Sequence, residues 1–251
     1  MTSPITTRRR FTILLFTIAA GSVDAIVYLA AHVFTANMTG NAVLFGIAAG
    51  QGQALAATHS IIALLAFIAG IIIGAITVRQ YGKSTRWTFV RRAVLLETVL
   101  LALFAAMFLL PSPGSPLQPK LAQSPTSILL LIVFSGLAMG LQSAVVRRLN
   151  MPGIATTYIT GTITNLFAGL VHHWGHPSET EADRQQMHDL RSGLRLQAEV
   201  FLTYALAAVT CGALYLRRPA ATALLPVLAI ATLTIYMFIR HRQLEAAGQL
   251  H

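Results

Sequence analysis

Long apolar runs, separated by short clusters of charge, constrain this chain more than any other feature of its sequence. Six runs are 18 to 21 residues long, and each contains at most one charged residue. They are residues 11–31, 59–78, 93–110, 127–146, 196–216 and 219–239. About 20 apolar residues are enough for a helix to cross a bilayer. Charged residues make up only 10% of the chain, whereas a soluble domain carries about 25%. The sequence therefore predicts an all-α membrane protein.

Two further apolar stretches, 34–50 and 152–172, begin with polar and small residues, so that only their later halves resemble good helices. If both crossed the membrane, the 18 Lys and Arg residues would divide equally between its two sides. If both instead enter and leave on one side, 15 of the 18 lie on the side of the N-terminus, as expected for the cytoplasmic side. We therefore expect six transmembrane helices, two re-entrant hairpins, and cytoplasmic N- and C-termini. The 152–172 stretch is nevertheless long enough to span.

The order of these elements repeats, because each half of the chain contains a span, a hairpin and two more spans. The expected parts are a first membrane repeat at 1–110, an external Pro-rich linker at 111–126, a second membrane repeat at 127–242 and a C-terminal tail at 243–251. Within the second repeat we expect a cytoplasmic loop at 173–195, with a surface helix from residue 178. Three crossings per half would invert the second repeat relative to the first, and inverted repeats with interrupted helices are a common transporter design.

Asp24 is the most informative single residue. It lies 13 residues into the first span, roughly 20 Å from the cytoplasmic end. A charged group at that depth costs at least ~2.5–3.5 kcal/mol. Two interpretations stay open: Asp24 binds a proton, a cation or a substrate, or its carboxylate caps backbone N–H groups of the neighbouring hairpin. Capping would still place it at the functional site.

The hairpins share a Thr-Gly turn, Thr39-Gly40-Asn41 in the first half and Thr160-Gly161-Thr162 in the second. Non-helical backbone at membrane depth must be buried in protein or line a cavity. Helix N-termini pointing inward would present partial positive charge to an anion or a polar solute. In the alternative interpretation, these polar residues only hold helices together. The candidate substrate- or ion-binding residues are Asp24, Asn37, Thr39, Gly40, Asn41, Gln142, Thr160, Gly161, Thr162 and Asn165.

The remaining polar residues have ordinary interpretations. Glu97 and Glu199 lie near the cytoplasmic ends of their spans, which favours snorkelling or ion pairing. The histidines at 172, 173 and 176 have no specific ligand spacing, so we expect a polar loop and no metal site. The net charge of +10 is explained by orientation in the membrane and not by nucleic-acid binding. No common catalytic or nucleotide-binding signature occurs, so we expect neither an enzyme nor a cofactor.

Three glycine pairs, Gly46/Gly50, Gly70/Gly74 and Gly136/Gly140, match the small-xxx-small pattern of closely packed membrane helices. The lone cysteine, Cys211, excludes an intrachain disulfide. It lies in an apolar run and is expected to be a small core residue.

Several strings resemble one known family. The first half contains Gly21-x-x-Asp24-Ala25-x-x-Tyr28-Leu29 and Phe34-x-Ala36-Asn37-Met38-Thr39-Gly40-Asn41, and the second contains Gly140-Leu141-Gln142-x-Ala144-x-x-Arg147, Pro152-Gly153 and Thr160-Gly161-Thr162. Over nearly its whole length the chain is similar to the YoaK-type bacterial membrane proteins, a family known chiefly as a domain of unknown function. The resemblance implies a six-span protein of the bacterial cytoplasmic membrane and supplies no substrate.

The leading functional hypothesis is a small-molecule transporter or channel-like permease in which two opposed hairpins meet near the midplane. Its partners would be the lipid bilayer and an unidentified small-molecule or ion substrate, and a homo-oligomer is compatible with the sequence. The alternative is a non-transporting scaffold or sensor that acts through the loop at 173–195. An intramembrane enzyme ranks third, because Asp24 has no obvious second catalytic group.

Overall fold

A computed structural model of the chain describes residues 7–79, 86–109, 111–112, 115–119, 125–148, 159–175 and 181–246. These residues form eight helices and one short antiparallel hairpin of two strands. The helices are α1 (Thr7–Ala31), α2 (Met38–Gly50), α3 (Ala54–Arg79), α4 (Arg86–Leu109), α5 (Pro125–Arg148), α6 (Ile159–Gly175), α7 (Glu181–Tyr215) and α8 (Pro219–Ala246). The strands are β1 (Pro111–Ser112) and β2 (Ser115–Pro119).

The expected spans correspond to six of these helices, α1, α3, α4, α5, α7 and α8, and the two atypical stretches contain the short helices α2 and α6. In the described part of the chain, five helices are long and apolar enough to cross a membrane: α1, α3, α5, α7 from Arg191 and α8. Helix α4 is 24 residues long. Of its side chains that the structure describes, three are charged, Arg91, Arg92 and Glu97, whereas the most apolar stretch of each of the five contains at most two charged residues. The fold is therefore helical and multi-pass.

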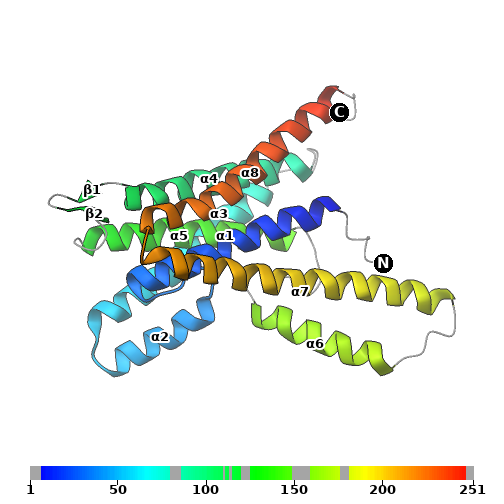
Figure 1. Cartoon of the computed structure of the whole chain (residues 1–251), viewed down its shortest axis with the longest axis horizontal. Helices are drawn as coiled ribbons and strands as arrows, with labels where there is room; N and C mark the ends of the chain where they lie inside the picture. Colours follow the sequence, from blue (N-terminus) through cyan, green and yellow to red (C-terminus); the bar gives the residue numbers. More distant parts are fainter. Residues whose placement is uncertain are drawn as a thin grey trace.

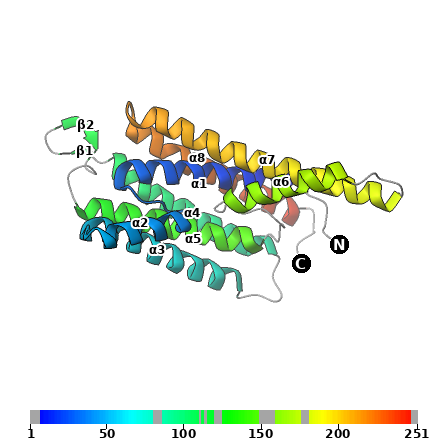
Figure 2. The ribbon, with the colours of Figure 1, turned by 90° about the horizontal axis from the view of Figure 1, so that it is seen from below.

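The long helices lie side by side in an elongated bundle, with both chain termini at one end and the β1–β2 hairpin at the other (Figure 1). Helices α2 and α6 both begin near the middle of this bundle. Helix α2 runs outward to the hairpin end, whereas α6 runs outward to the end that holds the termini (Figure 1). Their first turns lie near each other in this view and in the view turned by 90° (Figure 2).

The helix contacts of the two halves correspond to one another. Helix α3 packs on α5 as α7 packs on α1, and α4 packs on α5 as α8 packs on α1. Helix α2 lies against α3 as α6 lies against α7. The remaining contacts of α1 with α5 and of α4 with α8 join equivalent helices of the two halves. This matched pattern follows the order of elements in the sequence.

Glycines allow the closest of these contacts. A Cβ atom on Gly70 would collide with the backbone of Leu137, and one on Gly140 would collide with the backbone of Phe67. A Cβ on Gly136 would lie only 2.8 Å from the side chain of Ala66. The expected close packing is thus found for two of the three glycine pairs, at the α3–α5 contact. At Gly46 and Gly50 no atom lies within 4 Å of an added Cβ, so the third pair has no such neighbour.

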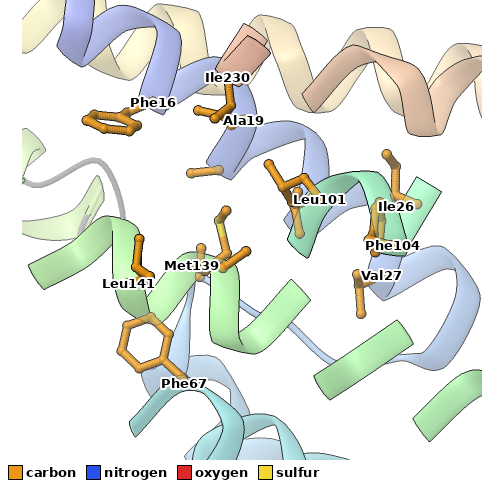
Figure 3. Close-up of a cluster of buried hydrophobic side chains, with 14 of the residues drawn as sticks. Phe16, Ala19, Ile26, Val27, Phe67, Leu101, Phe104, Met139, Leu141 and Ile230 are labelled. Carbon is orange, nitrogen blue, oxygen red and sulfur yellow. The ribbon is translucent and has the colours of Figure 1, made fainter. Parts of the chain in front are cut away.

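The apolar core lies where α1, α3, α4, α5 and α8 meet. Phe16 and Ile26 of α1, Phe104 of α4, Met139 of α5 and Ile230 of α8 are fully buried there (Figure 3). Large apolar side chains are also exposed on the outside of the bundle, such as Leu65, Ile72, Leu206 and Leu228. An apolar exterior around an apolar core is what a lipid environment permits, because hydrocarbon solvates such side chains.

Two connecting regions differ from expectation. Part of the linker at 111–126 forms the β1–β2 hairpin. The stretch at 173–195 is largely helical, because α6 continues to Gly175 and α7 begins at Glu181. The expected surface helix is therefore the first part of α7, a single helix of 35 residues that is about 52 Å long. Helix α8 also extends to Ala246, past the expected boundary at 242.

Candidate functional site

The end of α1 is where the chain turns back into the bundle. His32 adopts a left-handed conformation with φ of 56°, and its N–H donates to the carbonyl of Tyr28 at 2.9 Å. A residue in this conformation commonly terminates a helix because it redirects the backbone. Residues 33–37 are not helical, and α2 begins at Met38.

Asp24 anchors this returning segment. Its Oδ1 accepts hydrogen bonds from the backbone N–H of Thr35 at 2.8 Å and of Ala36 at 2.7 Å. Its Oδ2 accepts the hydroxyl of Tyr204 on α7 at 2.6 Å. Asp24 precedes the end of α1 by seven residues, or about 10 Å along the axis. The segment therefore returns by that depth alongside α1, with its N–H groups capped by a buried carboxylate.

Asn41 holds the same segment from the other side. Its Oδ1 accepts the backbone N–H of Phe34 at 2.8 Å, and its Nδ2 donates to the carbonyl of Phe34. Asn41 is fully buried. Backbone groups outside a helix must find partners within the protein when lipid surrounds it. Asp24 and Asn41 supply these partners for Phe34, Thr35 and Ala36, so the capping interpretation of Asp24 describes the observed geometry.

The other residues of the first turn shape the start of α2. Asn37 is its N-cap, and the Oδ1 of Asn37 accepts the N–H of Gly40 at 3.3 Å. A Cβ on Gly40 would lie 2.9 Å from the ring of Phe34, which itself stacks on Tyr28 with ring centroids 4.9 Å apart. A larger residue at position 40 would therefore force the ring of Phe34 to shift. Thr39 is exposed.

In the second half, Gln142 and Thr162 are buried. The Nε2 of Gln142 on α5 donates to the carbonyl of Phe16 on α1 at 3.1 Å. Gly161 and Asn165 on α6 are exposed, and no atom lies within 4 Å of a Cβ added to Gly161. The side chain of Thr160 lies outside the described residues. Of the predicted site residues, Asp24 and Asn41 therefore both bind the returning segment of the first hairpin. Gln142 binds α1 instead.

The acceptor positions of the Asp24 carboxylate are largely filled. A carboxylate has about four acceptor positions. Thr35, Ala36 and Tyr204 donate to them, and the backbone of Asn37 also hydrogen-bonds to Asp24. The hydroxyl of Thr35 is buried and has no hydrogen-bond partner in the described chain.

Two polar residues of the bundle were not recognised from the sequence, Tyr204 as the partner of Asp24 and Glu97 as an interior carboxyl group. Tyr204 was overlooked because it lies in an apolar run 180 residues from Asp24, although the hydroxyl of a buried tyrosine usually has a partner. For Glu97 the sequence predicts snorkelling or ion pairing, and this is wrong. It lies in the middle of α4, it is fully buried, and neither carboxyl oxygen has a hydrogen-bond partner among the described residues.

For Glu199 the ion-pairing interpretation is confirmed. Its partner is Arg10 on α1, whose Nε donates to Glu199 Oε2 at 2.7 Å. A second contact between the two side chains completes the ion pair. It joins α1 to α7 near the end of the bundle that holds the N-terminus (Figure 1).

The described residues contain no group of three His, Cys, Asp or Glu side chains that could hold a metal. The histidine cluster at 172, 173 and 176 is not tested, because His176 and the side chains of His172 and His173 lie outside the described residues.

Comparisons with known proteins agree with a membrane protein. A family model described as a protein of unknown function (DUF1275) matches residues 12–237. The chain is also similar to the UPF0700 transmembrane protein YoaK of Bacillus subtilis (strain 168), with 35% identity over 154 residues. The matched stretch covers 61% of this chain and 63% of the relative. No solved structure matches the chain.

Proposed function

This chain belongs to the DUF1275 family of unknown function, and we propose that it is a small-molecule transporter or channel-like permease of the bacterial cytoplasmic membrane. The polar site would lie between the two Thr-Gly hairpins and Asp24. The protein would act without a cofactor and would move its substrate without chemically changing it.

One observation carries this proposal. Two short helices, α2 and α6, begin near each other in the middle of the bundle and run to opposite ends of it (Figures 1 and 2). A helix that starts at mid-depth turns its unpaired N–H groups and the positive end of its dipole toward the interior. Transporters with broken helices use such N-termini to bind anionic or polar groups of a substrate near the midplane.

The matched helix contacts support a mechanism of alternating access. With both hairpins re-entrant, α1 to α4 and α5 to α8 would form two repeats of inverted topology, each with three crossings. Contacts between equivalent helices, α1 with α5 and α4 with α8, join the two halves. These contacts would form the axis about which one half rotates relative to the other. Rocking of this kind opens a fixed central site to each side in turn.

The distribution of positive charge supports the proposed orientation. Arg147 and Arg148 end α5 at the end of the bundle that holds both termini (Figure 1). Arg217 and Arg218 lie in the short turn between α7 and α8, at the opposite end. With the first end in the cytoplasm, most of the positive charge of the chain would lie inside, as is usual for bacterial membrane proteins.

Cysteine labelling tests the opposed hairpins. In a Cys211→Ser background, Thr39→Cys and Gly161→Cys place a thiol in the first turn of each short helix. A membrane-impermeant thiol reagent should reach position 39 from the external side and position 161 from the cytoplasmic side. Gly46→Cys, on the outer surface of α2, is the control for reaction within lipid. Thiols that react from neither side would contradict the proposed cavity.

A flux screen tests transport itself. Proteoliposomes that contain the purified protein should take up at least one member of a panel of small polar solutes and anions faster than empty liposomes. Asp24→Asn should slow that uptake, because the amide replaces one acceptor oxygen with a donor and disturbs the hairpin. An unchanged rate for Asp24→Asn with a confirmed substrate would remove this carboxylate from the mechanism.

A further inference from the structure

Glu97 is an ionisable residue in the interior of the described bundle. Its side chain is fully buried, with 0% accessibility. Both carboxyl oxygens lack a hydrogen-bond partner in the described chain. An ionised carboxylate without partners in an apolar interior carries a large desolvation cost, so such a group takes up a proton. The observed surroundings therefore fit a neutral carboxylic acid.

Its depth is also unusual. Eleven residues of α4 precede Glu97 and twelve follow it, so it lies about 17 Å from either end of the helix. Ala93, Val94 and Leu101, which share its helix face, are all fully buried. Leu101 belongs to the same buried apolar cluster as Ala19 and Ile26 of α1 (Figure 3). Glu97 therefore lies in the middle of the bundle and not at its cytoplasmic edge.

The position lies next to the contact of α4 with α8. The hydroxyls of the adjacent Thr98 and of Thr234 on α8 are 2.8 Å apart. Leu233, beside Thr234 on α8, is also fully buried, so Glu97 lies next to a helix contact that contains buried apolar side chains.

No charged neighbour explains Glu97. Asp24 on α1 is bonded to Thr35, Ala36 and Tyr204. On the helices that contact α4, the ionisable groups whose side chains the structure describes are His59 on α3, Arg147 and Arg148 on α5, and Tyr236, Arg240, His241 and Arg242 on α8. None of them forms a hydrogen bond with Glu97.

We propose that Glu97 is an intramembrane proton-binding site, and that its protonation is coupled to the movement of the two halves. In the observed conformation the carboxyl group holds its proton in the dry core. When α4 and α8 shift against each other, the group becomes hydrated and releases the proton as H₃O⁺ to water. An ionisable residue that a membrane protein keeps in its interior, at a cost in stability, commonly marks a proton pathway. The coupling to solute movement, but not the proton site, rests on the proposed function.

Carbodiimide labelling tests the proton site without a known substrate. A hydrophobic carbodiimide adds to a protonated carboxylic acid, and the resulting O-acylisourea rearranges to a stable N-acylurea where water is scarce. Mass spectrometry of the purified protein in lipid should find this adduct on the peptide containing Glu97, and its yield should fall as the pH is raised. Glu97→Gln should lose the adduct. A water-soluble carbodiimide should give little labelling.

Two results would overturn the proton site. One is the absence of an adduct on Glu97 at every pH tested, and the other is equal labelling by the hydrophobic and the water-soluble reagent. Thermal unfolding of Glu97→Leu separates a structural role. The variant should be at least as stable as the unchanged protein, because leucine removes the cost of burying a carboxyl group without hydrogen-bond partners. A large loss of stability would show that the carboxyl group has a structural role and would contradict the proposal.

The coupling is tested separately. In proteoliposomes with a pH gradient, Glu97→Gln should lose gradient-driven accumulation of a transported solute but keep exchange of that solute at equal pH. Accumulation that persists in Glu97→Gln would overturn the coupling. If the unchanged protein moves no solute at all, the transporter proposal fails, whereas the labelling result still decides whether Glu97 binds a proton.

Discussion

The hydrogen bond between Tyr204 and Asp24 gives the clearest prediction for a single residue. Tyr204→Phe removes the hydroxyl that lies 2.6 Å from Asp24 Oδ2 and keeps the ring. Hydrogen bonds to a charged group contribute about 1.5–3 kcal/mol. We expect the variant to lower the free energy of unfolding by that amount, measured by reversible unfolding in mixed micelles.

Tyr28→Phe is the matched control. Tyr28 also lies in this region, where its ring stacks on Phe34, and its side chain is 41% exposed. Loss of an exposed hydroxyl should change the stability by less than about 0.5 kcal/mol. In the Asp24→Asn background the effect of Tyr204→Phe should shrink, because the carboxylate is gone. Equal losses in both backgrounds would show that the two side chains are not coupled.

Some of the polar residues within the bundle could be recognised from the sequence, and others could not. Asp24 and Asn41 could be selected because a charge or an amide in an apolar stretch needs a partner. Tyr204 could not be paired with Asp24, because the faces that α1 and α7 turn to each other are set by packing along the whole bundle. Glu97 was misjudged for a related reason. The run of apolar residues begins at 93, whereas the helix begins at Arg86, so the residue lies deeper than the run suggests.

The glycine contact between α3 and α5 makes a prediction about helix packing. Gly140→Ala places a methyl group against the backbone of Phe67, which cannot move without displacing α3. Inserting atoms into a packed core typically costs about 1–3 kcal/mol. We expect a corresponding drop in the free energy of unfolding of Gly140→Ala.

Gly212→Ala on α7 is the control for this substitution, since no atom lies within 4 Å of its added Cβ. Alanine is a better helix former than glycine by up to ~1 kcal/mol, so this variant should be as stable as the unchanged protein or slightly more stable. Similar losses for both variants would contradict a specific role for the α3–α5 contact.

The ion pair between Arg10 and Glu199 links α1 to α7, and its effect should be small. Arg10 is 54% exposed and Glu199 is 29% exposed, and pairs near the surface contribute up to about 1 kcal/mol. Arg10→Ala should therefore lower the stability by less than that, and high salt should remove the difference. The swap of Arg10→Glu with Glu199→Arg should recover part of the loss. A large, salt-independent loss would instead indicate that Arg10 packs against other groups.

Helix positions were more predictable than connections. The apolar runs identified all the long helices, and the polar beginnings of 34–50 and 152–172 identified α2 and α6 as short. For the polar stretch at 173–195 the sequence predicts a loop with a surface helix from residue 178, but not that this helix is continuous with the span at 196–216. Polarity marks contact with water, and a helix that extends beyond the membrane is polar as well, so α7 could continue to Glu181 without an apolar signal.

For the whole molecule, the order of spans and hairpins along the chain predicted the helix contacts better than the similarity of single residues did. The similarity between the two Thr-Gly turns is weak, and at Gly161 it is not required by packing. The sequence of span, hairpin and two spans is nevertheless mirrored in which helices touch. A repeat of this kind constrains three-dimensional contacts because equivalent helices meet equivalent neighbours.

The last prediction concerns the orientation of the whole bundle in the membrane. Gln53 lies at the start of α3 and Arg217 in the turn after α7, at one end of the bundle, whereas Gln243 lies near the end of α8, at the other. In a Cys211→Ser background, cysteines at 53 and 217 should react with an impermeant thiol reagent added to intact cells. A cysteine at 243 should react only after the membrane is permeabilised. This pattern follows because α2 would leave the membrane on the side it entered, so that α1 and α3 connect on the external side. If α2 instead crossed fully, the cysteine at 53 would be protected in intact cells, and a re-entrant first hairpin would be contradicted.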